Sequence, residues 1–171
     1  MPQKQKTDLA RAAYETAKNY ELKFGCCPQC VLSSVQQTVG LIGDDVIKAS
    51  HGLSGGGGLL GMGTCGALSG GLLALSCKRG RDHDKLDKGK FISNFRAGEK
   101  LVNKFRDEFG GVTCAQLQVS FTGRTYDMWD AEQYAEFERA REELRGKVLA
   151  CWCAPDQACH ADILLEIANR R

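Results

Sequence analysis

The sequence has no long apolar run, little net charge and no export signal, and each absence disfavours a class of protein. The most apolar stretch, residues 59–75, is rich in glycine and too short for a transmembrane helix. The net charge is +2 with acidic and basic residues interspersed, so no basic stripe indicates nucleic-acid binding. The N-terminal residues 1–7 are polar and do not resemble a signal peptide. We therefore expect a cytoplasmic protein without membrane insertion.

Several motifs of common enzyme and cofactor classes are also missing. No G-x-x-x-x-G-K-[ST] run and no strand pattern precede the glycine-rich stretch, which disfavours a nucleotide-binding loop. No histidine follows Cys30, so covalent haem attachment through a C-x-x-C-H motif is excluded. Asp127, Asp130 and Glu132 lie near one another, but helix capping explains them, so a hydrolase is disfavoured.

Cysteine, in contrast, is abundant. The chain of 171 residues contains nine cysteines, an odd number that argues against a complete disulfide framework. Disulfides are rare in proteins of reducing compartments, whereas clustered thiols there indicate metal binding or redox chemistry. Cys27 and Cys30 form a C-x-x-C at a helix start. Cys151, Cys153, Cys159 and His160 form a second local group that could bind a metal, although its spacing matches no familiar zinc motif.

Residues 51–77 hold ten of the twenty glycines and predict a glycine-rich loop that leads into a helix. Thr64 is the expected N-cap, which places Cys65 in the first turn, where the helix dipole should lower the pKa of its thiol. Gly66, Gly70 and Gly71 leave one face of this helix bare. That face could pack closely on another helix, on a second copy of the chain in a homodimer, or on a cofactor, for which Gly63, Gly66 and Gly70 are the candidate contacts.

The remaining chain predicts a mostly α fold, a compact bundle of six to seven helices around the glycine-rich helix. Apolar residues at helical spacing place helices over residues 8–24, 27–39, 46–52, 91–109 and 131–144, and a short one begins at Cys114 after a Thr113 cap. Expected buried residues are Leu9, Ala13, Ala17, Tyr20 and Phe24 in the first helix, Phe91, Phe95, Gly98, Val102, Phe105 and Phe109 in the longest apolar pattern, and Cys77. Residues 1–145 form the expected all-α domain. Residues 146–171 form a Cys-rich segment packed on it, with a short strand candidate at 147–152 and a last helix after Cys159.

Three motifs resemble a known family of small bacterial and archaeal proteins described as redox-active, with a C-G-A-x-x-G motif and four cysteines. They are the segment from Cys27 to Leu32, the segment from Cys65 to Gly70, and the Gly111–Cys114 turn. The Thr122–Trp129 loop is similar to a G-R-S-F-D-L-W stretch of the longer members. The resemblance covers about residues 20–138, and the C-terminal tail departs from it. The family also resembles part of a dimeric multihaem cytochrome with extra cysteines that are thought to hold an iron–sulfur centre.

The resemblance places the first three family cysteines at Cys27, Cys65 and Cys114, and the fourth at Cys153, with Cys151 and Cys159 as alternatives. It implies a redox-active protein in which these four thiolates hold an iron–sulfur cluster for electron transfer to an unknown partner. One alternative is thiol–disulfide chemistry without metal, in which Cys65 attacks and Cys27 or Cys30 resolves. Another is a structural zinc-binding or interaction protein. The sequence alone leaves these three functions open.

Overall fold

The computed structural model describes residues 3–143, and within that range the protein is a helical bundle without a sheet. The prediction of a mostly α fold with six to seven helices is confirmed. The elements in chain order are α1 (Gln3–Phe24), α2 (Cys27–Val39), α3 (Asp44–Ala49), the 3₁₀ helix η1 (Ser50–Gly56), α4 (Gly66–Arg79), the 3₁₀ helix η2 (His83–Lys85), α5 (Ile92–Phe109), α6 (Cys114–Thr122) and α7 (Ala131–Glu143). The predicted strand at 147–152 and the Cys-rich segment lie outside the described residues.

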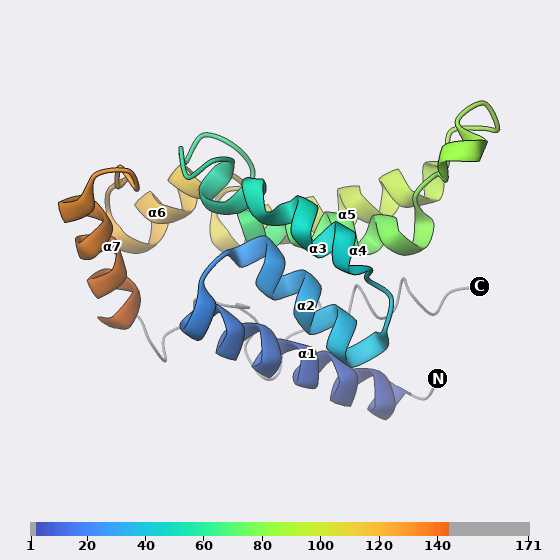
Figure 1. The fold of residues 1–171 in the computed structure, drawn as a ribbon, viewed down its shortest axis with the longest axis horizontal. Helices are drawn as coiled ribbons and strands as arrows, with labels where there is room; N and C mark the ends of the chain where they lie inside the picture. Colours follow the sequence, from blue (N-terminus) through green and yellow to red (C-terminus); the bar gives the residue numbers. More distant parts are fainter. Residues whose placement is uncertain (1–2, 144–171) are drawn as a thin grey trace.

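The helices form two packed pairs joined through α2 and α4. Helices α1 and α2 make an antiparallel hairpin, α2 packs on α4, and α4 packs on α5 (Figure 1). Helices α6 and α7 lie at the end of the bundle where α1 passes into α2, and the charged connection 81–90 projects at the opposite end. No helix within residues 3–143 is long and apolar enough to cross a membrane. Because α4 packs on both α2 and α5, this glycine-rich helix is central to the bundle, as the sequence predicts.

Helix boundaries follow local capping chemistry in most places. Gly40 and Gly110 end α2 and α5 in the left-handed conformation, which glycine adopts without steric cost. Thr113 accepts a hydrogen bond from Gln116 N–H, and the Gln116 side chain accepts one from Thr113 N–H in return, a complete capping box. Asp130 accepts from Gln133 N–H at 2.9 Å and so caps α7. The predicted caps of α6 and α7 are confirmed.

Two predictions of buried faces are confirmed only in part: Ala13, Ala17, Phe105 and Phe109 are buried, but other predicted residues are not. Helix α1 starts at Gln3 rather than after Thr7, and it buries Ala10 with Ala13 and Ala17, whereas Phe24 is 73% exposed. In α5 the buried residues are Ala97, Leu101, Phe105 and Phe109, and Phe95 is 66% exposed. The reason lies in α4: the Leu101 Cδ2 atom stands 3.1 Å from where a Gly71 Cβ would be. Leu101 thus fills the space that glycine leaves, which turns this face of α5 inward.

The bare face of α4 packs within the chain. A Cβ on Gly70 would stand 3.0 Å from both the Cα and the carbonyl oxygen of Pro28, and 3.1 Å from the Val31 Cβ. Helix α2 therefore approaches α4 backbone to backbone, which only glycine permits. Of the three interpretations of this face, close helix packing is confirmed, and the face is not available to a second copy. The homodimer itself stays a prediction.

Candidate functional site

Cys27 lies at the start of α2, where two unusual backbone conformations reverse the chain. Gly25 and Cys26 both have positive φ, 62° and 65°, and the second of these is uncommon for a residue with a side chain. The reversal brings Cys27 back beside the end of α1. There the Cys27 thiol donates to the Glu21 carboxylate at 3.5 Å.

Cys65 and Cys114 are held by one short piece of antiparallel backbone. Thr64 and Thr113 form an isolated β-bridge. On either side of it, Cys65 N–H donates to Val112 O at 2.8 Å, and Cys114 N–H donates to Gly63 O at 3.1 Å. The two cysteines thus stand at the starts of α4 and α6 with their backbones tied together. Nearly fifty residues of sequence separate them.

This bridge corrects the predicted start of α4. Cys65 itself occupies the N-cap position, α4 begins at Gly66, and no side chain caps the helix. Thr64 is the bridge residue and not a cap. The physical reason is that pairing with Thr113 holds Thr64 in an extended segment one residue too early for the N-cap position.

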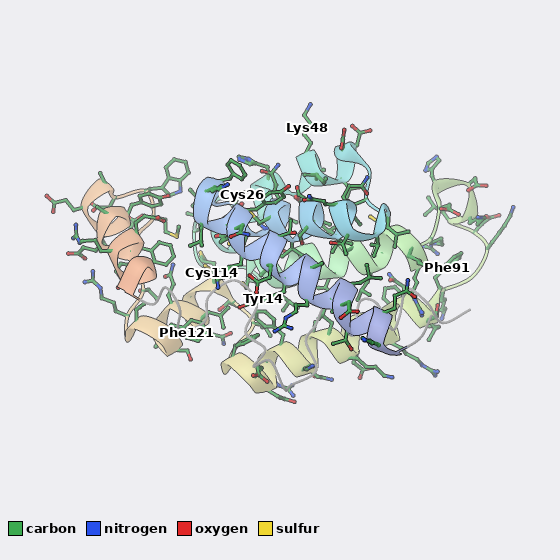
Figure 2. The ribbon with its side chains drawn as sticks, turned by 90° about the horizontal axis from the view of Figure 1, so that it is seen from below. Tyr14, Cys26, Lys48, Phe91, Cys114 and Phe121 are labelled. Atoms are coloured by element: carbon green, nitrogen blue, oxygen red, sulfur yellow. The ribbon has the colours of Figure 1, made fainter. Side chains whose placement is uncertain are left out.

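The start of α4 also touches the start of α2. A Cβ on Gly66 would stand 2.7 Å from Pro28 Cδ and 3.1 Å from Cys27 Cβ. The residue after Cys65 is therefore in contact with Cys27. Together with the bridge, this contact brings Cys27, Cys65 and Cys114 to one corner of the molecule, from three separate elements (Figure 2 labels Cys114 at the start of α6 and Cys26 at the junction of α1 and α2).

The glycine loop shapes this corner sterically. A Cβ on Gly56 would stand 2.9 Å from the Cys114 Cβ, and a Cβ on Gly63 would stand 2.6 Å from the Gly56 carbonyl oxygen. The loop N–H groups bond to the loop's own carbonyls, as in Gly61 N–H to Gly55 O at 2.8 Å and Gly63 N–H to Gly56 O at 2.7 Å. At these positions the N–H groups are paired within the loop, and the glycines allow close approach of the backbone to Cys114, while cofactor contacts at Gly63, Gly66 and Gly70 stay a prediction.

Burial dominates the electrostatics of two of the three thiols. It raises the pKa of Cys65 above the ordinary value of 9.0, against the backbone N–H groups of Leu68 and Ala67, which lower it, and the charge of Glu21 raises it further. Burial also raises the pKa of Cys114 from 9.0 to about 11, with a contribution from the charge of Cys65. The predicted low pKa of Cys65 is wrong for the metal-free protein, because desolvation outweighs the field at the helix start.

The other cysteines have different surroundings. The buried Cys30 thiol donates to Gly25 O at 2.8 Å. The Cys26 sulfur lies 2.8 Å from Ser54 Oγ. Cys77 is exposed, which corrects its predicted burial: it follows the last buried residue of α4, Leu75, on the outer side of the helix. Cys151, Cys153, Cys159 and His160 lie outside the described residues.

Sequence reasoning missed two polar side chains at this corner, Glu21 and Gln118. Glu21 contacts the Cys27 thiol, and its charge acts on Cys65. Gln118 is only 5% exposed, and its Nε2 lies 3.9 Å from the Cys114 sulfur. The i,i+4 spacing of Cys114 and Gln118 on a short helix was the one signal that could have found the second contact.

The donor set fits an iron–sulfur centre in kind but is incomplete. Three cysteines stand at helix starts that contact one another, and thiolate is the ligand that such centres use. Within residues 3–143, however, no group of three or more His, Cys, Asp or Glu side chains is arranged to hold a metal ion. A fourth ligand would have to come from outside the described residues, where Cys153 was predicted.

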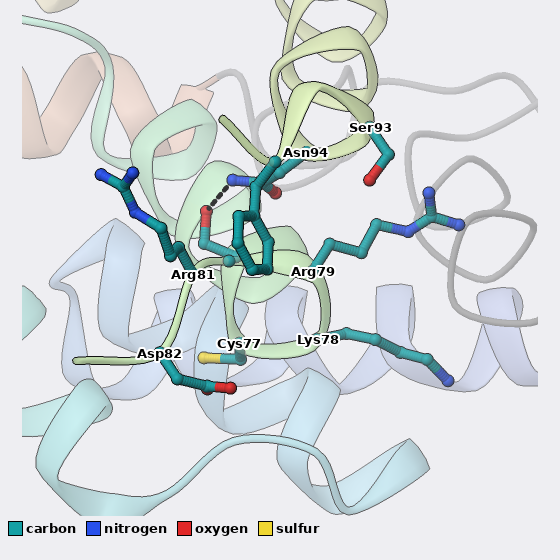
Figure 3. Close-up of a pocket in the computed structure, with 10 residues that line it drawn as sticks. Cys77, Lys78, Arg79, Arg81, Asp82, Ser93 and Asn94 are labelled. Carbon is teal, nitrogen blue, oxygen red and sulfur yellow. Dashed lines mark hydrogen bonds between the residues drawn. The ribbon is translucent and has the colours of Figure 1, made fainter. Parts of the chain in front are cut away.

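A separate cavity lies at the other end of α4. It has a volume of about 980 Å³ and lies between the end of α4 and the start of α5, with Cys77, Arg79 and Asn94 among its lining residues (Figure 3). Its charged side chains do not converge on one point in Figure 3, and Arg81 is occupied by the carbonyls of Leu86 and Gly89 at 2.9 Å each. The length of α4, at a rise of about 1.5 Å per residue, places this cavity about 20 Å from Cys65.

Over residues 3–143, the fold and the site define a helical protein in which cysteines from three elements meet beside a glycine-rich loop. The chain belongs to the family described as "Putative redox-active protein (C_GCAxxG_C_C)", whose profile matches residues 25–167. The match extends well beyond residue 138. The C-terminal tail, which the motif resemblance left out, is therefore part of the family region. No curated protein and no solved structure matches the chain significantly.

Proposed function

We propose that the protein transfers electrons through an iron–sulfur cluster held by Cys27, Cys65 and Cys114, with Cys153 as the fourth ligand. The family is described as redox-active, which agrees with this function in its coarser form. The observation that carries the proposal is that three cysteines, at the starts of α2, α4 and α6, lie at one half-buried corner.

Each element has a definite task in this proposal. The bridge between Thr64 and Thr113 sets the spacing of Cys65 and Cys114, and the contact of Gly66 with Cys27 sets the position of the third thiol. Partial burial of the corner limits access of water, which would help to protect a cluster and to set its potential. The cluster, when bound, would supply one-electron chemistry that thiols alone do not provide.

A second function is favoured by one observation, the closeness of Cys65 and Cys114. Their backbones are joined by the bridge, and the charge of Cys65 acts on Cys114. In this alternative the two thiols lose two electrons and two protons to an oxidised disulfide of a partner and form a Cys65–Cys114 disulfide. Cys30 is a poor resolving thiol, because it already donates to Gly25 O.

Anaerobic purification of the untagged chain, with an absorption spectrum and assays for iron, zinc and acid-labile sulfide, tests the proposal. A brown protein with matched iron and sulfide supports it, and Cys→Ser changes at positions 27, 65, 114 and 153 should each reduce both. Cys77→Ser is the matched control, because this exposed thiol lies far from the corner, and it should keep the wild-type content. A protein that stays colourless and iron-free after reconstitution with iron and sulfide would overturn the proposal. Zinc at one per chain would instead support the structural alternative.

A further inference from the structure

Gln118 is a buried polar side chain that faces sulfur on two sides. It lies on α6 one turn after Cys114 and is 5% exposed. Its Nε2 atom lies 3.9 Å from the Cys114 Sγ and 3.5 Å from the Met128 Sδ. A buried amide is costly unless its polar atoms are paired, so a glutamine in this place needs a physical reason.

The orientation of the amide is fixed by a neighbouring backbone group. Tyr126 N–H donates to Gln118 Oε1 at 3.1 Å. A backbone N–H can pair only with the oxygen of the amide, so the oxygen faces Tyr126 and the NH₂ group faces Cys114. The assignment of donor and acceptor at the sulfur therefore follows from the hydrogen-bond network.

The Thr122–Trp129 loop, which is similar to a stretch of the longer family members, holds this arrangement in place. Thr122 Oγ1 donates to Gln118 O at 2.7 Å, at the point where the loop leaves α6. At its far end, Trp129 Nε1 donates to Gly58 O at 3.0 Å, which attaches the loop to the glycine-rich segment. That segment packs on Cys114 through Gly56. The loop thus closes around the Cys114 corner from the side of α6 and α7.

We propose that Gln118 is a positioning residue whose N–H group holds the Cys114 sulfur and raises the reduction potential of the redox centre that contains Cys114. The inference rests on the proposed function. Reduction adds negative charge to the sulfurs of such a centre, and an N–H donor stabilises that charge more strongly in a buried site than in water. Hydrogen bonds to sulfur are among the means by which proteins set cluster potentials.

The potentials of two substitutions at this position test the inference. Gln118→Met keeps the side-chain volume and removes both donors, and Gln118→Glu keeps an acceptor for Tyr126 N–H while removing the amide donors. In reconstituted protein, each should lower the equilibrium constant for reduction about tenfold, which is about 59 mV for a one-electron couple. The measurement is a spectroelectrochemical titration of the full chain.

The matched control is Gln133→Met. Gln133 Oε1 accepts from Asp127 N–H at 3.1 Å, so this change loosens the same loop without touching sulfur. Its potential should equal that of the wild type. Equal potentials for wild type and both Gln118 variants would overturn the inference, as would a Gln133→Met shift as large as theirs, because the effect would then belong to the loop.

A second readout separates failure of this inference from failure of the proposed function. In the metal-free protein, the side-chain amide protons of Gln118 should shift in nuclear magnetic resonance spectra when Cys114 is changed to alanine, and unchanged signals would overturn the contact itself.

If the wild type holds no cluster, the proposed function fails. The Gln118 variants are then compared with wild type in glutathione redox buffers, where the Cys65–Cys114 couple should shift in the same direction. An unchanged equilibrium constant there would overturn the inference independently.

Discussion

Substitution of Gly66 by alanine should destabilise the protein by forcing α2 and α4 apart. The added Cβ would stand 2.7 Å from Pro28 Cδ and 3.1 Å from Cys27 Cβ. A proline ring carbon and a Cβ are fixed close to the backbone and cannot rotate away. The strain must therefore be relieved by movement of one helix against the other.

The size of the effect follows from two opposing terms. Overpacking of a well-filled contact typically costs about 1–3 kcal/mol. Replacing glycine by alanine inside a helix gains up to about 1 kcal/mol, and less is expected here because Gly66 is the first residue of α4. The expected result is a loss of about 1–2 kcal/mol in the free energy of unfolding.

Equilibrium urea unfolding followed by circular dichroism at 222 nm measures this loss. Gly52→Ala is the matched control: nothing lies within 4 Å of the position where its Cβ would stand, so its stability should stay within about 0.5 kcal/mol of wild type. Because the strained contact includes Cys27, iron content after reconstitution should also fall in Gly66→Ala and not in the control. A Gly66→Ala protein as stable as wild type would refute the close approach of the two helices.

Three further predictions concern the same region. Thr113→Ala removes the capping box of α6 and should cost about 0.5–2 kcal/mol in urea unfolding, whereas Thr125→Ala, outside any helix, should cost little. Because burial raises the pKa of Cys114 from 9.0 to about 11, the unfolded chain releases this proton at lower pH than the folded protein, so stability should fall as pH rises from about 9 to 11. Cys114→Ser should flatten that part of the profile, and an equally steep fall would contradict it. At pH 8, iodoacetamide should modify exposed Cys77 well before half-buried Cys65, whose pKa desolvation raises; peptide mass spectrometry can follow this, and faster labelling of Cys65 would contradict it.

Much of the fold could be predicted from sequence because its signals are local. Gly40, Gly110, Thr113 and Asp130 mark helix ends through chemistry that depends on a few neighbouring residues. The close approach at α4 was also predictable, since glycines that repeat on one helix face cost stability unless another element uses the space. The partner of that face was not predictable, because the choice between α2, a cofactor and a second copy depends on tertiary packing.

The features that sequence reasoning got wrong or missed all depend on tertiary packing. Thr64 has the chemistry of a cap, but pairing with Thr113 takes precedence. Phe95 follows an apolar spacing, yet Leu101 takes the buried side of α5 because it fits against Gly71. Glu21 lies in an ordinary charged helix and becomes part of the site only through the chain reversal at Gly25 and Cys26. No pattern in α1 marks it.

The electrostatics of the corner disfavour a reactive thiolate in the metal-free protein. A nucleophilic cysteine is activated by nearby positive charge or a strong helix field, which lowers its pKa. Here burial raises the pKa of both Cys65 and Cys114, and the Glu21 carboxylate acts on Cys65 in the same direction. In the proposed function, a bound metal centre would supply the positive charge that these thiols otherwise lack and would have to displace their protons. Cluster assembly should therefore release protons and become more favourable as pH rises. Attack by a low-pKa Cys65 thiolate on a partner disulfide would instead require positive charge near Cys65, which would lower its pKa.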